Sequence, residues 1–108
     1  MSPAQAWGLL LVAGLLEIAW AVGMKSTDGF TRLVPSVIVT GIALASFWLL
    51  GLAMKVLPVG TAYAVWVGIG AAGAAVAGML IHQEPATALR LACIALILAG
   101  VIGLKLLA

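Results

Sequence analysis

Residues 33–54 read LVPSVIVTGIALASFWLLGLAM, a run without a charged side chain. A helix needs about 20 mostly apolar residues to cross the roughly 30 Å of hydrocarbon in a bilayer. Inside a bilayer the backbone polar groups find no water, so a helix, which pairs them internally, is the structure that such a run can adopt. The run therefore predicts a transmembrane helix.

Two more long apolar runs flank this segment. Residues 4–22 are apolar except for Gln5 near the start and Glu17, and residues 59–81 carry no charge. Each run is long enough to cross a bilayer. The connections between the runs are short, so sequential helices are expected to be antiparallel neighbours.

The fourth run is the shortest, because only residues 91–104 are free of charge. Arg90 and Lys105 at its two ends can extend their charged groups toward water, which restores a full span. We therefore expect an all-α membrane protein with one domain, residues 1–108. Its four transmembrane helices are expected over residues 4–22, 33–54, 59–81 and 88–106.

The composition excludes several classes of protein. The chain is 66% hydrophobic and 7% charged, whereas soluble domains have about 25% charged residues. Four spans nearly exhaust the chain, which leaves no room for a soluble catalytic domain. The five basic residues are scattered, so no nucleic-acid-binding patch is expected. One His and one Cys on different segments form no metal-binding set, so we expect no enzyme, metal or other cofactor.

The basic residues are almost evenly divided between the two sides of the membrane. With four spans, Lys55 and Lys105 share one side, while Lys25, Arg32 and Arg90 share the other. Cytoplasmic loops normally hold the excess of Lys and Arg. Because the excess is so small, we hypothesise that the chain inserts in both orientations and assembles as an antiparallel homodimer.

Glu17 is the only ionisable residue deep in a span. A charged acid there costs about 2.5 to 3.5 kcal/mol on insertion scales, so it must be compensated or protonated. Such a group can exchange a proton for a cation, and a functional role is the default interpretation. The alternative is a structural acid that forms a hydrogen bond to a neighbouring helix.

Aromatic residues at helical spacing accompany this acid. Gly14, Glu17 and Trp20 lie three residues apart and share a face, which can form the wall of a binding site. Tyr63 and Trp66 repeat the same spacing on the third predicted helix. Tyrosine supplies a hydroxyl for a carboxylate, and tryptophan supplies the best aromatic face for a cation.

Three further positions have two interpretations each. Ser46, in the middle of a span, can form a hydrogen bond to an acid or to its own i−4 carbonyl. Small residues dominate the segment 68–78 and predict close helix packing, with the third helix as the packing hub. Gly68 and Gly70 in this segment could serve packing alone or could also permit a kink.

The chain resembles the small multidrug resistance family of bacterial transporters from end to end. The motifs that carry the resemblance are Glu17, residues 29–36 (GFTRLVPS), residues 46–50 (SFWLL) and residues 58–70, which contain AYAVW at positions 62–66. Within that family it looks like the guanidinium-exporter branch. The supporting features are Trp20, the Gly/Ala-rich segment 68–78 and residues 84–90 (EPATALR).

The resemblance implies an antiparallel, dual-topology homodimer in the bacterial inner membrane that exchanges protons for guanidinium by alternating access. Glu17 from both subunits would bind either protons or the substrate. Ser46, Trp20 and Tyr63 would hold these carboxylates by hydrogen bonds, and Trp66 would line the cavity. An inverted copy of the chain would thus supply the second half that single-chain transporters contain as an internal repeat.

Two rival functions stay open at this point. The nearer one is a polyspecific exporter of quaternary ammonium or aromatic cations, which would differ in how crowded the cavity is around Glu17. The other is a membrane subunit that does not transport, in which Glu17 only joins helices. The side chain of Trp20 favours a small substrate.

Overall fold

The computed structural model describes residues 1–107, and these residues form an all-α structure. The long helices are α1 (Pro3–Gly23), α2 (Leu33–Ala53), α3 (Val59–Ile81) and α4 (Ala88–Leu107), with a short 3-10 helix, η1 (Met24–Thr27), after α1. All four long helices have the length and hydropathy of membrane spans. The predicted fold class, an all-α membrane protein with four transmembrane helices, is confirmed.

The start of α1 is fixed by a reciprocal pair of hydrogen bonds. The backbone N–H of Gln5 donates to the Ser2 hydroxyl at 3.2 Å, and the backbone N–H of Ser2 donates to Gln5 Oε1 at 2.9 Å. Pro3 occupies the first helical position, where a missing N–H costs nothing. Gln5, a polar residue in the first apolar run, therefore belongs to the helix cap.

The connection from α1 to α2 is organised by the buried side chain of Thr27. Its hydroxyl donates to the Met24 carbonyl at 2.7 Å and accepts from the Phe30 N–H at 3.1 Å. Asp28, Gly29 and Phe30 all have positive φ, at 49°, 70° and 64°. Non-glycine residues rarely adopt this conformation, so the bonds of Thr27 stabilise a sharp reversal that returns α2 alongside α1.

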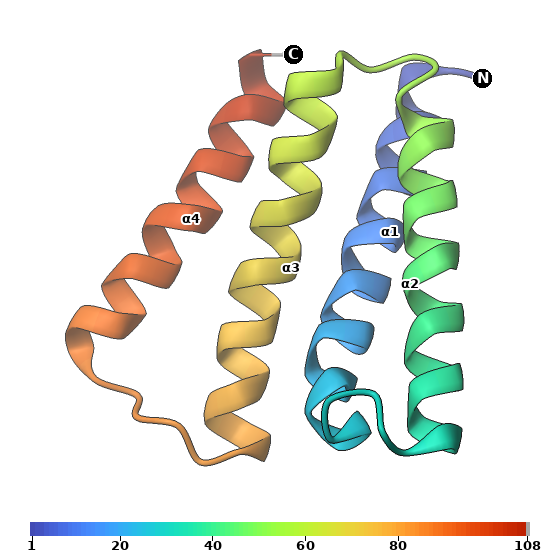
Figure 1. Ribbon diagram of the computed structural model, residues 1–108. Coiled ribbons are helices and arrows are strands. Elements are labelled where there is room, and N and C mark those ends of the chain that lie inside the picture. Colours follow the sequence, from blue (N-terminus) through green and yellow to red (C-terminus); the bar gives the residue numbers. More distant parts are fainter. Residues whose placement is uncertain (108) are drawn as a thin grey trace.

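The helices form a flat, open arrangement of 39 × 36 × 16 Å. In Figure 1 the order across the molecule is α4, α3, α1 and α2, and both termini lie at the end that also holds the α2–α3 connection. Helix α1 packs against both α2 and α3, whereas α4 packs along α3 alone, apart from one side-chain contact with α1 described below.

The buried core lies in the half of the molecule nearer the termini. It consists of Ala6, Leu10, Ala13, Leu50, Ala53, Leu57, Ala62, Val65 and Trp66. Many large apolar side chains elsewhere are exposed, and Ile94 is the one buried residue of α4 within the described residues. Apolar surface of this extent is suited to lipid rather than to water.

Glycines on α3 allow its neighbours to approach closely. A Cβ at Gly73 would overlap the side chain of Ile18 on α1, and one at Gly68 would overlap Val101 on α4. In this structure α3 runs as a continuous helix from Val59 to Ile81, and Gly68 is the position at which Val101 of α4 approaches it. Small residues at helix contacts are the usual means of close packing in lipid.

Candidate functional site

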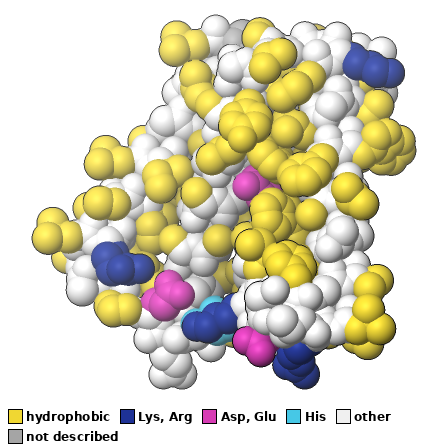
Figure 2. Space-filling model, in the orientation of Figure 1, with side chains coloured by type: hydrophobic (Ala, Val, Ile, Leu, Met, Phe, Trp, Pro, Cys, Tyr) yellow, Lys and Arg dark blue, Asp and Glu magenta, His cyan; other side chains and the backbone are white. Residues whose placement is uncertain are grey.

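Glu17 points from α1 toward the backbone of α3. A Cβ at Gly70 would overlap the Glu17 carboxyl group, so the absence of a side chain at position 70 provides the space in which this group lies. Figure 2 shows an acidic side chain among hydrophobic side chains in the middle of the front face. Of the three acidic residues, only Glu17 lies inside a helix. Glu17 is half-buried in this chain, and its carboxyl group lies in the middle of an apolar span.

Two buried polar atoms of α1 have no partner within residues 1–107. Oε2 of Glu17 is an acceptor without a donor, and Nε1 of Trp20 is a donor without an acceptor. Buried polar atoms are nearly always paired. Glu17 and Trp20, one turn apart on α1, thus offer an acceptor and a donor with which another molecule could form hydrogen bonds.

Ser46 joins three helices through one buried hydroxyl. It donates to the carbonyl of Ala13 on α1 at 2.7 Å and accepts from Nε1 of Trp66 on α3 at 2.9 Å. The i−4 carbonyl of its own helix is therefore not its partner in this structure, and neither is Glu17. In an α-helix the Ala13 carbonyl also accepts from the N–H of Glu17, so the network adjoins the acid through the backbone.

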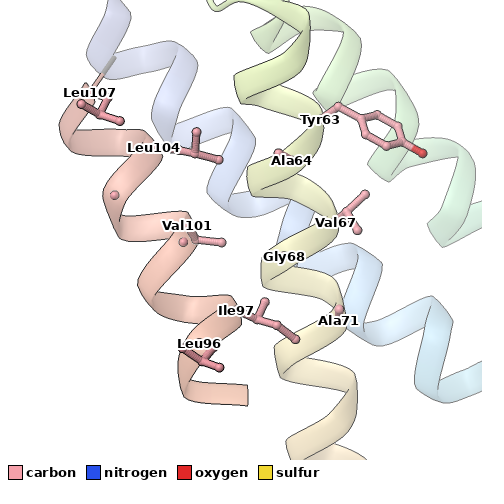
Figure 3. Close-up of a pocket in the computed structure, with 12 residues that line it drawn as sticks. Tyr63, Ala64, Val67, Gly68, Ala71, Leu96, Ile97, Val101, Leu104 and Leu107 are labelled. Carbon is pink, nitrogen blue, oxygen red and sulfur yellow. The ribbon is translucent and has the colours of Figure 1, made fainter. Parts of the chain in front are cut away.

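Four aromatic rings form a row across α1, α2 and α3. Phe47 stands between Trp20 and Trp66, with ring centroids 6.1 Å and 5.6 Å away in edge-to-face geometry. Tyr63 continues the row, 5.5 Å from Trp66, and Figure 3 shows its ring extending from α3 away from α4. Such rings present flat, electron-rich faces to a cation.

The structure brings together most of the predicted site residues. Glu17, Trp20, Ser46, Tyr63 and Trp66 lie in one region of α1, α2 and α3, linked by the contacts above. Gly14 is placed differently, because it is buried and a Cβ there would lie 2.8 Å from Cγ2 of Ile69. Gly14 therefore contacts α3 and does not line the open surface.

Phe47 belongs to the site but was not among the predicted residues. It connects the tryptophans of α1 and α3. The only signal for it in the sequence is its place directly after Ser46, within the motif SFWLL. Helix α2 is apolar on all sides, so its sequence pattern does not distinguish the side facing the acid from the side facing lipid.

A large groove lies beside this region, between α3 and α4. It has a volume of about 730 Å³ and an apolar lining that includes Gly68, Ile97 and Val101, with Tyr63 at one end. Figure 3 shows α3 and α4 as its two walls. Glu17 does not line this groove. The groove and the acid are thus separate features, and Tyr63 is the site residue that borders both.

Four apolar spans, with one intramembrane acid between α1 and α3 and a row of aromatic rings beside it, define the molecule as a small membrane protein with a site suited to an organic cation. Comparison with known proteins agrees. The model of the family described as Small Multidrug Resistance protein matches residues 5–97. The chain therefore belongs to the small multidrug resistance family and is a multi-pass protein of the bacterial inner membrane.

Curated relatives resemble the chain over nearly its full length. A protein named Guanidinium exporter from Escherichia coli (strain K12) is 58% identical over 102 residues, which cover 94% of this chain and 97% of the relative. Proteins of the same name from Citrobacter freundii and Salmonella typhimurium are 56% identical with the same coverage.

Proposed function

We propose that this protein is a proton-coupled antiporter that exports guanidinium and related small guanidinyl cations by alternating access. The observation that carries the proposal is the Glu17 carboxyl group, which lies against Gly70 inside the apolar region with one oxygen unpaired. The relatives named Guanidinium exporter support the choice of substrate. No nucleotide is needed, because the proton gradient supplies the free energy.

The chemistry of guanidinium suits a site made of carboxylates and aromatic rings. The ion is planar and permanently charged, and its N–H groups form a fork that carboxylates bind through paired hydrogen bonds. Its weak hydration lowers the cost of leaving water. The faces of Trp20 and Phe47 would add cation–π attraction to a flat ion lying near Glu17, with the buried ring of Trp66 packed behind Phe47.

Competition between two ligands would couple the flows. A protonated Glu17 cannot pair with guanidinium, and a guanidinium-bound Glu17 cannot accept a proton. When the site opens to the side with more protons, protonation releases the cation there. When it opens to the other side, loss of the proton lets the next cation bind. Protons moving inward would therefore drive guanidinium outward.

We further propose that the working unit is an antiparallel homodimer with two Glu17 side chains around one cavity. The near balance of basic residues on the two sides supports insertion in both orientations. The unpaired Oε2 of Glu17 and Nε1 of Trp20 support the arrival of groups from a second copy or from the substrate. An inverted copy would also give the symmetry that transporters use to alternate access.

Electrical recording on reconstituted protein tests the proposal. Addition of guanidinium to proteoliposomes under a pH difference should produce a current, because the two Glu17 carboxylates of the dimer would exchange two protons for one guanidinium and so move net charge. Tetra-substituted ammonium at the same concentration should produce little. A large response to the ammonium and none to guanidinium would favour the rival polyspecific exporter, and no response to either would favour a subunit that does not transport.

A further inference from the structure

A second groove runs between α1 and α4. These two helices flank α3 without packing on each other, and the space between them has a volume of about 380 Å³. Its floor is α3, through Val65 and Ile69, and its walls include Leu11 of α1 and Ile102 of α4. The groove is lined by apolar groups and spans one to two helical turns of each helix, roughly 5 to 10 Å.

The positively charged side chain of Lys105 lies at one end of this groove. Nζ of Lys105, in the last turn of α4, lies 4.8 Å from the ring centroid of Trp7, in the first turns of α1. Both residues line the groove. Within residues 1–107, no carboxylate oxygen lies within the 4.0 Å of an ion pair with Lys105. The ammonium group of Lys105 thus lies over the ring of Trp7 and has no ion-pair partner within residues 1–107, so an anion can bind to it.

The position of the pair matches the surface of a bilayer. Lys105 and Trp7 lie at the end of the molecule that carries both termini, while Val65 and Ile69 lie deeper. Tryptophan and lysine at the ends of spans commonly lie at headgroup depth. An anion at Lys105 would therefore lie at the membrane surface, and an apolar chain in the groove would lie deeper. The phosphate and the acyl chain of a phospholipid have the same arrangement.

We propose that the α1–α4 groove binds the upper part of one acyl chain of an anionic phospholipid, such as phosphatidylglycerol, with the lipid phosphate paired to Lys105. The bilayer around the protein supplies this occupant. Attraction of a single basic residue enriches anionic lipid about fivefold over neutral lipid. The groove is distinct from the cation site, because Trp66 and Gly70 lie on a different face of α3 from Val65 and Ile69, which line the groove.

Quenching of tryptophan fluorescence by brominated lipids tests this proposal on the full-length protein. The protein is placed in phosphatidylcholine discs with increasing fractions of brominated phosphatidylglycerol or brominated phosphatidylcholine. The part of the quenching that is lost in Trp7→Phe reports contact at the groove. Brominated phosphatidylglycerol should quench half of this Trp7 fluorescence at a fraction of the disc lipid about fivefold lower than brominated phosphatidylcholine requires.

Three variants separate the groove from general surface charge. Lys105→Gln should abolish the preference for phosphatidylglycerol, whereas Lys55→Gln, which removes a charge on the same side, should keep it. Gly8→Ile should reduce quenching by both lipids, because position 8 lines the groove and has open space around a Cβ. Retained guanidinium transport shows that each variant is folded, and Gly8→Ile still tests the groove if Lys105→Gln does not assemble.

Three results would overturn the proposal. Equal quenching by the two lipids would show that the ammonium group does not select an anionic headgroup. An equal loss in Lys55→Gln would assign the preference to diffuse charge. Quenching of Trp7 by neither lipid would show that another occupant, such as a second copy of the chain, covers the groove.

Discussion

The carboxyl group of Glu17 lies against the backbone of Gly70, so closely that a methyl group at position 70 would overlap it. The two residues come from α1 and α3, which pack along each other. Gly70 therefore fixes where the acid lies along α3 and which way it faces. Within the small-residue segment 68–78 of α3, Gly70 is the residue that leaves space for the Glu17 carboxyl group.

Gly70→Ala should displace the Glu17 carboxyl group or separate α1 from α3. Overpacking of this kind costs about 1 to 3 kcal/mol, and a displacement of about 1 Å in a binding group can cost up to about a hundredfold in activity. Guanidinium uptake into proteoliposomes and thermal unfolding measure the two effects. Gly100→Ala is the control, because a Cβ there meets nothing within 4 Å, and equal transport by both variants would contradict the role of Gly70.

Glu17→Gln should abolish proton-coupled guanidinium transport while the protein still assembles. The amide keeps the shape of the side chain but cannot carry the charge that pairs with the cation. Glu84→Gln is the matched control, since it loses only a half-exposed ion pair with Arg90 at 3.8 Å, worth at most about 1 kcal/mol. Coupled transport that survives in Glu17→Gln would exclude the proposed mechanism.

Guanidinium binding should weaken as the pH falls. Protons and the cation compete for Glu17, so each proton released on binding raises the apparent Kd by up to about tenfold per pH unit on the acidic side. Titrations followed by tryptophan fluorescence, from mildly acidic to mildly alkaline solution, measure this dependence. An affinity that does not change with pH would rule out competition.

Ser46→Ala should destabilise the protein by about 1 to 2 kcal/mol, because it leaves the buried Nε1 of Trp66 without an acceptor and removes the bond to Ala13. Unfolding in denaturing detergent measures the loss. Ser36→Ala is the control on the same helix, since its hydroxyl donates to the Arg32 carbonyl at an exposed position and should cost less than about 0.5 kcal/mol. Equal losses would show that the buried network adds no stability.

The orientation of the chain should respond to small changes of charge. A C-terminal reporter on the natural sequence is expected on both sides of the membrane, and a one-sided signal would refute dual insertion. Changing Lys25 and Arg32 to Gln should place the Lys55 side in the cytoplasm and lower transport. Coexpression with a variant in which Lys55 and Lys105 are Gln should restore transport, because the two forms insert oppositely.

The spans and the central acid could be predicted because lipid imposes strict rules. A run such as residues 33–54 has few alternatives to a helix in a bilayer, and Glu17 stands out because charge in lipid is costly. The aromatic residues at i, i+3 spacing were also identified. These features depend on the local sequence alone.

The contacts between helices could not be predicted in the same way. Spacing places Gly14 on the face of Glu17, yet it does not reveal that this part of the face meets Ile69. The partner of Ser46, a carbonyl 33 residues earlier in the chain, depends on how α1 and α2 are aligned. In lipid both the packed and the exposed sides of a helix are apolar, so Phe47 carried no pattern that assigned it to the site.

The buried core occupies the half of the molecule that holds the termini. In an antiparallel pair, the end of one copy that holds the buried core would lie beside the opposite end of the other copy at each membrane surface. If the two copies adopted different conformations, exchanging these conformations would convert an inward-facing pair into an outward-facing one with the same internal contacts. The two states would then be equal in energy by symmetry, and only the gradients across the membrane would set the direction of travel.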